Sequence, residues 1–318
     1  MTDLFSRKID YLRISITDRC NSHCKYCTSK DVTHFPRTEI LSYEELLRLC
    51  TIMAQLGVEN FRITGGEPLV RKGCVPFVKS LKAIPGAKNV TLTTNGISHN
   101  YIHDLANAGL DGLNISLDSV VREKYKQITG VDALGDVWQS INKAIKYGIP
   151  VKINAVIIKD INHCEILPLA AIAEKLPVSV RFIELMPTIV NTGLVGISNA
   201  DVLQILSTKY EDLTHDNTYY GHGPARYYNS KSLLGKLGFI SPLNHNFCQN
   251  CNRLRISSTG FLRLCLHHNQ GVDLRSILRN GYTNEQIKSA IVAGVRNKPL
   301  QHLLESETNL QDMSKVGG

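Results

Sequence analysis

Residues 12–27 read LRISITDRCNSHCKYC, in which a short β-rich run passes directly into a loop that carries three cysteines. We expect Leu12–Ile16 to form a strand that ends where the polar loop begins. Cys20, Cys24 and Cys27 then follow in a C-x3-C-x2-C pattern. Three thiolates this close together converge easily on one soft metal centre. Four would close the coordination of an iron–sulfur cube or a zinc ion, so three leave one metal position open to a ligand.

The alternation of short β-rich runs and amphipathic helical stretches continues to about residue 184. Ser42-Tyr-Glu-Glu45 is a capping box that marks the start of one helix, and Gly57 marks its end. Near-continuous apolar strands between helices predict a parallel sheet with the helices outside it. Six such units, connected right-handedly, predict an α/β fold, an incomplete (β/α)6 TIM-type barrel. The six predicted strands are Leu12–Ile16, Asn60–Thr64, Val90–Thr94, Gly112–Leu117, Val151–Val156 and Val178–Ile183.

Polar or glycine-rich residues follow these strands at the points where they end. Thr64-Gly65-Gly66-Glu67-Pro68 comes after the second strand, Thr93–Gly96 closes the third and Ser116–Asp118 the fourth. Glu184-Leu-Met186-Pro187 follows the sixth. Parallel barrels build their sites at this edge of the sheet, so we expect the functional site there. Six strands, unlike a closed ring of eight, would also leave a lateral opening for a large substrate.

A second group of cysteines lies near the C-terminus. Cys248, Cys251 and Cys265 form a C-x2-C-x13-C pattern. His267 and His268 follow closely, so a closed zinc site with three cysteines and one histidine competes with an open cluster. Spacing alone leaves both interpretations open.

The other three cysteines carry no ligand pattern. Cys50 falls on an apolar helical stripe, and Cys74 and Cys164 have no ligand neighbours at useful spacing, so we expect all three to be packing residues. Beyond residue 190 the strand–helix alternation stops. We therefore expect a partial barrel over residues 1–220 and a C-terminal domain over residues 221–318.

Composition excludes several classes of protein. The chain has 318 residues, of which 43% are hydrophobic, and 36 Lys and Arg against 28 Asp and Glu give a net charge of +8. Such a chain can bury a core, so it is not a disordered tail protein. A charge of this size suits an anionic small substrate as well as nucleic acid, but the absence of a dense basic block argues against direct nucleic-acid binding. We expect no membrane span or signal segment, and nine cysteines argue against a disulfide framework. We therefore expect a soluble, cytoplasmic protein.

The three-cysteine loop with Tyr26 before its last cysteine, followed by the Gly-Gly-Glu-Pro turn, resembles the radical S-adenosylmethionine (SAM) superfamily. The resemblance implies a [4Fe–4S] cluster on the three thiolates, with the amino and carboxylate groups of SAM on the fourth iron. Such a cluster gives one electron to the sulfonium, and a 5′-deoxyadenosyl radical results. The glycines are expected to let the backbone approach that ligand.

Many stretches together resemble the GTP 3′,8-cyclase family of molybdenum cofactor biosynthesis. This resemblance favours a second [4Fe–4S] cluster over zinc at the C-terminal group. It implies a lyase that converts GTP to (8S)-3′,8-cyclo-7,8-dihydroguanosine 5′-triphosphate, with SAM and two [4Fe–4S] clusters as cofactors. The matching stretches are LRISITDRCN, RITGGEPLVR, TTNG, NISLDS, VKINAVI, RFIELMP, GPARYY, FISP, FCQNCNRLRISSTGFLRLCL and MSKVGG.

The same resemblance implies site residues. Cys20, Cys24 and Cys27 would hold the SAM cluster, and Cys248, Cys251 and Cys265 the second one, whose open iron meets guanine. The SAM-binding positions would be Tyr26, Gly66, Ser116 and Met186, and the GTP-binding positions Arg13, Arg62, Thr93, Lys152, Arg253, Leu254 and Arg255. Catalytic support would come from Arg253, Arg255 and the terminal Gly317 and Gly318. The alternatives are ordinary barrel-mouth charges at Lys152 and Arg62 and strand-end caps at Thr93 and Ser116.

The family also implies partners: an external one-electron reductant, cyclic pyranopterin monophosphate synthase as the downstream enzyme, and a homodimer. Two rival functions stay open, a radical SAM maturase of peptides with an auxiliary cluster and a non-catalytic zinc module. The chain departs from the family pattern at Thr28-Ser29 and at Thr188–Asn191, where altered loops are expected.

Overall fold

In the computed structural model, the residues described are 1–27, 32–188, 190–191, 193–218, 220–243 and 247–302. Their strands form one twelve-stranded sheet in the order β12-β11-β10-β1-β2-β3-β4-β5-β6-β9-β8-β7. The strands are β1 (Tyr11–Ser15), β2 (Asn60–Thr64), β3 (Asn89–Thr94), β4 (Gly112–Ser116), β5 (Val151–Ile157), β6 (Ser179–Glu184), β7 (Thr214–Asp216), β8 (Arg226–Asn229), β9 (Lys236–Ile240), β10 (Arg253–Ile256), β11 (Phe261–Arg263) and β12 (Gly271–Asp273).

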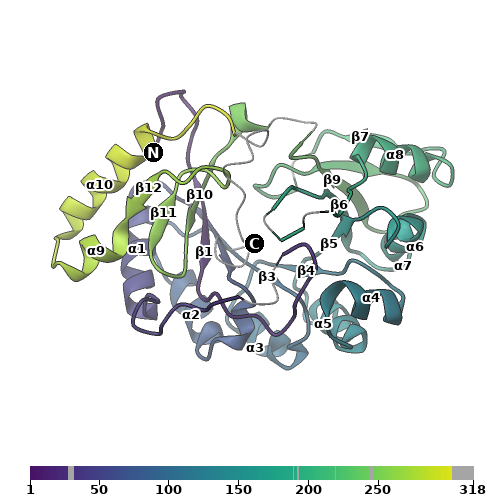
Figure 1. Cartoon of the computed structure of the whole chain (residues 1–318), viewed down its shortest axis with the longest axis horizontal. Helices are drawn as coiled ribbons and strands as arrows, with labels where there is room; N and C mark the ends of the chain where they lie inside the picture. Colours follow the sequence, from purple (N-terminus) through teal and green to yellow (C-terminus); the bar gives the residue numbers. More distant parts are fainter. Residues whose placement is uncertain (28–31, 189, 192, 219, 244–246, 303–318) are drawn as a thin grey trace.

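Helices line the outer side of the curved sheet (Figure 1). The helices are α1 (Tyr43–Gln55), α2 (Cys74–Lys82), α3 (Ile102–Asn107), α4 (Arg122–Thr129), α5 (Leu134–Lys146), α6 (Ile166–Ala170), α7 (Ile172–Lys175), α8 (Asn199–Ser207), α9 (Leu274–Arg279) and α10 (Asn284–Arg296), with 3-10 turns at η1 (Pro68–Val70), η2 (His99–Tyr101), η3 (His163–Glu165) and η4 (Cys248–Asn250). No helix within the described residues is both long and apolar enough to cross a membrane.

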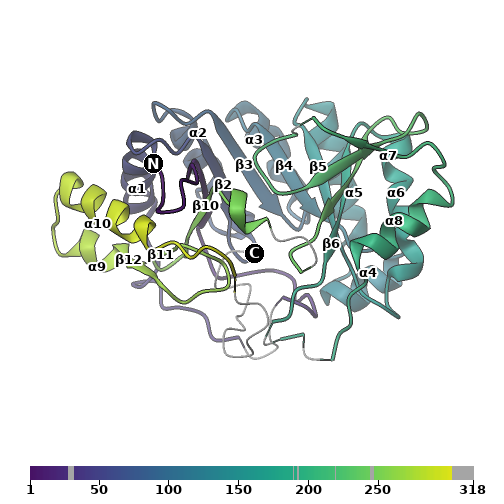
Figure 2. The ribbon, with the colours of Figure 1, turned by 90° about the horizontal axis from the view of Figure 1, so that it is seen from above.

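The six predicted strands correspond to β1–β6, and their parallel order is confirmed. The C-terminal strands extend this sheet at both ends, which the sequence analysis did not predict. β10 adds in parallel beside β1, and β9 adds in parallel beside β6. Antiparallel strands then finish each edge. In Figures 1 and 2, α9 and α10 accordingly lie beside β11 and β12, away from α8.

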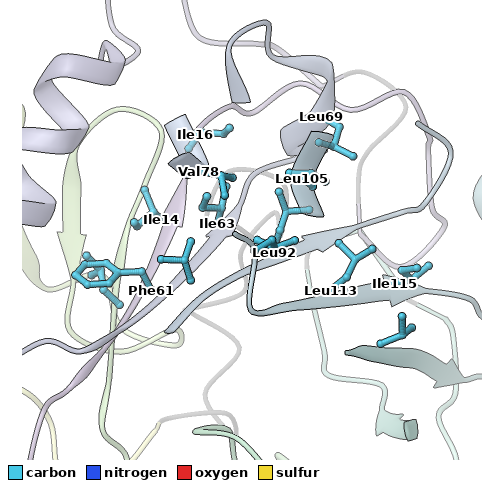
Figure 3. Close-up of a cluster of buried hydrophobic side chains, with 14 of the residues drawn as sticks. Ile14, Ile16, Phe61, Ile63, Leu69, Val78, Leu92, Leu105, Leu113 and Ile115 are labelled. Atoms are coloured by element: carbon cyan, nitrogen blue, oxygen red, sulfur yellow. The ribbon is translucent and has the colours of Figure 1, made fainter. Parts of the chain in front are cut away.

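The apolar core lies between the sheet and the outer helices. Buried and half-exposed positions alternate along β3 and β5. The near-continuous burial that was expected is found in β1, β2 and β4, whereas alternate residues of β3 and β5 are half-exposed. The inner face carries the polar groups described below. Figure 3 shows the apolar layer, where Val78 of α2 and Leu105 of α3 lie close to Ile63 and Leu92.

Helix α1 begins and ends as the sequence predicts. The Ser42 hydroxyl accepts a hydrogen bond from the Glu45 amide at 3.2 Å, and the Glu45 carboxylate accepts one from the Ser42 amide at 2.7 Å. This capping box satisfies two of the unpaired donors at the helix start. Past the helix end, Gly57 has φ +91°, a left-handed conformation that glycine adopts without strain.

Candidate active site

The first cysteine loop follows the carboxyl end of β1. The Cys27 amide donates to the Cys24 carbonyl at 2.9 Å, and the His23 amide donates to the Thr129 carbonyl at the end of α4 at 2.8 Å. Burial raises the pKa of Cys24 well above its usual value, and the sulfurs of Cys27 and Cys20 raise it further. The three thiols are therefore close enough to repel one another when ionised, as the ligands of one cluster must be.

The Gly-Gly turn packs against the backbone of this loop. The Gly66 amide donates to the Thr17 carbonyl at 2.7 Å, and the Glu67 amide donates to the Arg19 carbonyl at 2.8 Å. A Cβ at Gly66 would lie 2.5 Å from the Arg19 oxygen, and one at Gly65 would lie 2.7 Å from the Thr17 oxygen. The glycines were expected to make room for a ligand. Their first role in this structure is to admit the cysteine loop itself.

Glu67 connects this turn to the end of β3. Its buried carboxylate accepts hydrogen bonds from the Asn95 amide at 2.7 Å, the Thr94 hydroxyl at 2.8 Å and the Leu69 amide at 3.0 Å. Burial outweighs these bonds and raises its pKa to about 7. The Asn95 side chain in turn donates to the Asn21 side chain, within the cysteine loop, at 2.7 Å. The ends of β2 and β3 thus hold the loop in place.

Asp118 performs a similar task at the end of β4. The Tyr26 hydroxyl donates to one of its oxygens at 2.7 Å, and the Val156 amide of β5 donates to the other at 2.8 Å. Burial raises the pKa of Asp118 to about 6, although both hydrogen bonds lower it. Asp118 therefore fixes the aromatic residue of the cysteine loop, a role that the sequence analysis missed.

The four positions predicted for SAM lie at one edge of the sheet. Tyr26 is in the loop after β1, Gly66 follows β2, Ser116 ends β4 and Met186 follows β6. Carboxyl ends of parallel strands meet at the same edge, so the topology brings these residues together. The Met186 carbonyl accepts a hydrogen bond from the Asn191 side chain at 2.8 Å. Their contact with SAM stays a prediction.

Arginines from three adjacent strands form a row across the sheet. The strand register places Arg255 beside Arg13, and Arg13 beside Arg62. Burial and then the charges of Arg255 and Arg62 lower the pKa of Arg13 well below its usual value. Burial and the charge of Arg253 likewise lower the pKa of Arg255 to about 10. The Arg62 guanidinium donates to the Thr91 hydroxyl at 3.3 Å, so the row ends on β3.

Lys152 and Arg181 continue the positive charge onto β5 and β6. The Arg181 guanidinium donates to the amide oxygens of Asn114 at 2.7 Å and Asn154 at 2.9 Å. Burial, followed by the charges of Arg181 and Arg62, lowers the pKa of Lys152 to about 7. Positive groups that lower the pKa of their neighbours in this way are arranged to bind an anion.

Arg181 was not among the predicted site residues. It is 4% exposed and lies between Val180 and Phe182, which are fully buried. A single arginine within an apolar run does not stand out in the sequence as a functional residue. Only the alternation of side chains along β6 indicates that it faces the polar interior. The predicted Thr93 is nearby, because its hydroxyl accepts from the Asn114 side chain at 3.5 Å.

The second cysteine group lies at the other end of the β1–β10 pair. Cys248 and Cys251 precede β10, and Cys265 follows β11, which runs antiparallel to β10. Burial raises the pKa of Cys251, but the charges of Arg253 and Lys298 outweigh it and the pKa falls to about 7. A cysteine held so easily as a thiolate is a ready metal ligand.

His267 and His268 were the candidates for a fourth ligand in the zinc interpretation. The His267 ring packs edge-on against His302 with centroids 5.6 Å apart, and His268 contacts the Gln301 carbonyl at 3.1 Å. Burial, then the charge of His302, lowers the pKa of His267 to about 4. Within the described residues, no three His, Cys, Asp or Glu side chains are arranged to hold a single metal ion.

All nine cysteines are free thiols, and the two trios fit the donor chemistry of iron–sulfur clusters. Cys50 and Cys74 are buried as expected. The packing role of Cys164 is wrong, because this thiol is exposed and accepts a hydrogen bond from the Lys124 ammonium at 2.8 Å. Its neighbour Glu165 turns inward instead. The predicted positions Thr28, Ser29, Gly317 and Gly318 lie outside the described residues.

Two family models match the chain in sequence. The model of the Radical SAM superfamily matches residues 14–172, and the model described as Molybdenum Cofactor Synthesis C matches residues 178–304. Among curated relatives, the GTP 3′,8-cyclase of Clostridium perfringens (strain SM101 / Type A) is 39% identical over 323 residues. That of Thermodesulfovibrio yellowstonii is 42% identical over 324 residues. Both alignments cover the whole of each chain.

Solved structures share the fold at low sequence identity. Streptococcus suis SuiB bound to S-adenosylmethionine gives a TM-score of 0.64 over 92% of this chain and 68% of that chain, at 16% identity. A tagged form of anSMEcpe with bound AdoMet gives 0.51 over 64% of this chain and 58% of that chain, at 20% identity. These likenesses confirm the expected α/β partial barrel and concern the fold alone.

Proposed function

The chain belongs to the GTP 3′,8-cyclase family of radical SAM enzymes, and on this premise we propose that its polar barrel interior binds GTP between two iron–sulfur clusters. The enzyme converts GTP to (8S)-3′,8-cyclo-7,8-dihydroguanosine 5′-triphosphate, the first step of molybdenum cofactor biosynthesis. It uses SAM and two [4Fe–4S] clusters. The peptide-maturase alternative has in its favour only a fold shared with Streptococcus suis SuiB, which is also solved bound to precursor peptide SuiA.

The proposed site rests on the position of the arginine row, Arg255, Arg13 and Arg62, which lies between the two cysteine trios. Cys20 follows the carboxyl end of β1, whereas Cys251 precedes the amino end of the parallel β10. The trios therefore follow opposite ends of one strand pair, whose five extended residues span about 16 Å. Arg13 and Arg255 lie side by side in the middle of that span. A nucleotide bound there would reach both ends.

The site divides into regions by chemistry. Cys20, Cys24 and Cys27 would hold the first cluster, which would supply the electron for SAM cleavage and hence the radical chemistry that joins C3′ of GTP to C8. One further electron and a proton would complete the dihydropurine. We assign the triphosphate to Arg62, Lys152 and Arg181, because guanidinium forks suit phosphate oxygens. We assign the purine to Arg253 and Arg255, which lie nearest the second trio. Fixing ribose and purine in one cavity brings the reacting carbons together.

Replacing Asp118 with asparagine tests the SAM end of the site. Removing the carboxylate weakens the hydrogen bond that holds Tyr26, and a hydrogen bond to a charged group contributes about 1.5–3 kcal/mol. We expect SAM to bind about tenfold or more weakly, measured by equilibrium dialysis with anaerobically reconstituted enzyme. Asp132→Asn, at an exposed ion pair with Arg122, is the control and should bind SAM normally. Equal SAM affinity in both variants would contradict the assignment.

The pKa of Lys152 predicts a proton linkage. In the free protein the pKa is about 7, so at about pH 8 most Lys152 side chains are neutral, whereas the triphosphate has lost its last proton. The bound anion favours the ammonium and raises that pKa, so binding takes up a proton. Calorimetry of GTP binding at about pH 8 should detect about one proton per GTP from the dependence of heat on buffer.

The Lys152→Gln variant is the control for this linkage. It should bind GTP more weakly and take up no proton, because the glutamine side chain does not titrate. Uptake that persists in this variant would mean that another group is responsible.

The reaction itself is tested by product analysis. Anaerobic incubation of the reconstituted enzyme with SAM, GTP and a strong reductant should yield 5′-deoxyadenosine and the cyclised nucleotide in equal amounts. Failure to bind GTP would favour a peptide maturase. A colourless protein with zinc and no iron would favour the binding module.

We also propose the finer partners of the family. These are an external one-electron reductant, cyclic pyranopterin monophosphate synthase as the consumer of the product, and a second copy of the chain in a homodimer. A cytoplasmic location is proposed on the same ground, supported by nine free thiols, which reducing compartments preserve.

A further inference from the structure

The ligands of the proposed second cluster come from two separate segments, and hydrogen bonds from two buried cations hold these segments together. One segment, before β10, carries Cys248 and Cys251, and the other, after β11, carries Cys265. The cations are Arg7 and Lys298, from opposite ends of the chain. Neither belongs to a cysteine motif, and nothing in the sequence analysis singled out either residue.

Lys298 connects the two cysteine segments directly. It is 2% exposed, and its ammonium donates to the Arg253 carbonyl at 2.8 Å and also to the Leu264 carbonyl. Arg253 lies two residues after Cys251, and Leu264 immediately precedes Cys265. One ammonium thus sets the spacing between the backbones that carry two of the three ligands.

Arg7 connects the third proposed ligand, Cys248, to the segment that carries Lys298. It is 6% exposed, and its guanidinium donates to the Cys248 carbonyl at 2.8 Å and to the Pro299 carbonyl at 2.7 Å. The Arg7 guanidinium also forms an ion pair with buried Asp3 at 2.6 Å. The carboxylate of Asp3 offsets the charge of Arg7. The hydrogen bonds of Lys298, by contrast, go to neutral carbonyls, so within the described residues they leave its charge without a carboxylate partner.

That remaining charge lies beside the segments that carry the sulfurs. The Lys298 ammonium bonds the carbonyl two residues after Cys251 and the carbonyl immediately before Cys265. Three thiolates on a cluster core of charge 2+ leave a net charge of about −1, which becomes about −2 on reduction. A buried negative group of this kind needs a nearby cation.

We propose that Lys298, oriented by Arg7, is the positioning and charge-compensating residue of the second cluster. The inference rests on the proposed function, because it requires a cluster on Cys248, Cys251 and Cys265. It predicts that the charge of Lys298 favours the reduced cluster and that its two hydrogen bonds keep the ligand segments assembled. Arg7 acts through Lys298 and the Cys248 backbone.

The experiment uses the full chain with Cys20, Cys24 and Cys27 changed to alanine, so that only the second trio can hold iron. After anaerobic reconstitution, the parent should carry about four iron atoms. Lys298→Met removes both the charge and the donors, whereas Lys298→Gln removes the charge and keeps a donor. The matched control is Lys288→Met on α10, where the lysine pairs with exposed Glu285.

Two readouts besides activity are measured: iron loss to a chelator and the potential by a redox titration followed by electron paramagnetic resonance. Both Lys298 variants should shift the ratio of oxidised to reduced cluster about tenfold toward oxidised at a fixed potential, which is about 59 mV for one electron. The Met variant should also lose iron at least about fivefold faster, because its ligand segments lose their two shared hydrogen bonds.

The outcomes distinguish the role of Lys298 from the proposed function on which it rests. A parent that binds no iron would overturn both. A parent that binds iron, with both Lys298 variants matching it in potential and iron retention, would overturn the inference alone. If Lys298→Met does not fold, as judged by circular dichroism, the Gln variant decides the question through its potential.

Discussion

Replacing Cys24 with serine is expected to abolish 5′-deoxyadenosine formation completely and to lower the iron content from about eight to about four atoms per chain. Cys24 is the middle cysteine of the first trio, and its pKa is raised by burial and by both neighbouring sulfurs. Only a bound metal offsets the cost of three thiolates at such a place. A serine hydroxyl is a hard and far less acidic donor, so the cluster should not assemble.

The outcome is read from iron and sulfide analysis together with chromatography of the SAM cleavage products. Cys164→Ser is the matched control, because this thiol is exposed and far from either trio in the chain. The control should keep both the iron content and the yield of 5′-deoxyadenosine. A Cys24→Ser enzyme that still cleaves SAM would refute the proposed function at its first step.

Replacing Arg181 with methionine should weaken GTP binding by about 10- to 100-fold, and this is the second large effect that we expect. Arg181 is held rigidly by Asn114 and Asn154, and its neighbours Lys152 and Arg62 are also positive. A charge-assisted hydrogen bond contributes about 1.5–3 kcal/mol, which corresponds to this range of affinity. Guanosine lacks the triphosphate, so its binding should hardly change.

Calorimetry with GTP and with guanosine distinguishes this effect from general damage to the fold. Arg122→Met, which breaks an exposed ion pair with Asp132, is the control and should bind both ligands as the parent does. GTP should raise the melting temperature of the parent and the control far more than that of the Arg181 variant. Equal losses for GTP and guanosine would place Arg181 outside the triphosphate region.

The central strands could be predicted from the sequence because each is a local β-rich run bounded by turns. All six predicted runs match β1–β6 to within one residue at each end. The pairing of β10 with β1 could not be predicted in the same way, because the two strands are far apart in the sequence. Nothing in either strand taken alone specifies its neighbour.

The candidate site likewise combines residues that a local sequence pattern predicts with residues that only the folded structure reveals. Cysteine spacing reflects coordination chemistry, so both trios could be proposed as ligand groups from the sequence alone. Asp118 and Arg181 were missed because each acts through contacts that only folding creates, with Tyr26 and with two asparagines. Cys164 was placed wrongly because the residue sits on a short 3-10 turn, where one position faces outward and the next inward.

The pairing of β1 with β10 has a consequence for folding of the chain during translation. Arg13 and its partner Arg255 are separated by 255 − 13 = 242 residues. At roughly 5–20 residues per second, the first edge of the sheet waits about 12–50 s before the ribosome delivers the strand that covers it. During that interval an apolar, hydrogen-bonding edge is exposed to other nascent chains. Any helper that shields the N-terminal half must therefore stay bound until translation is almost complete.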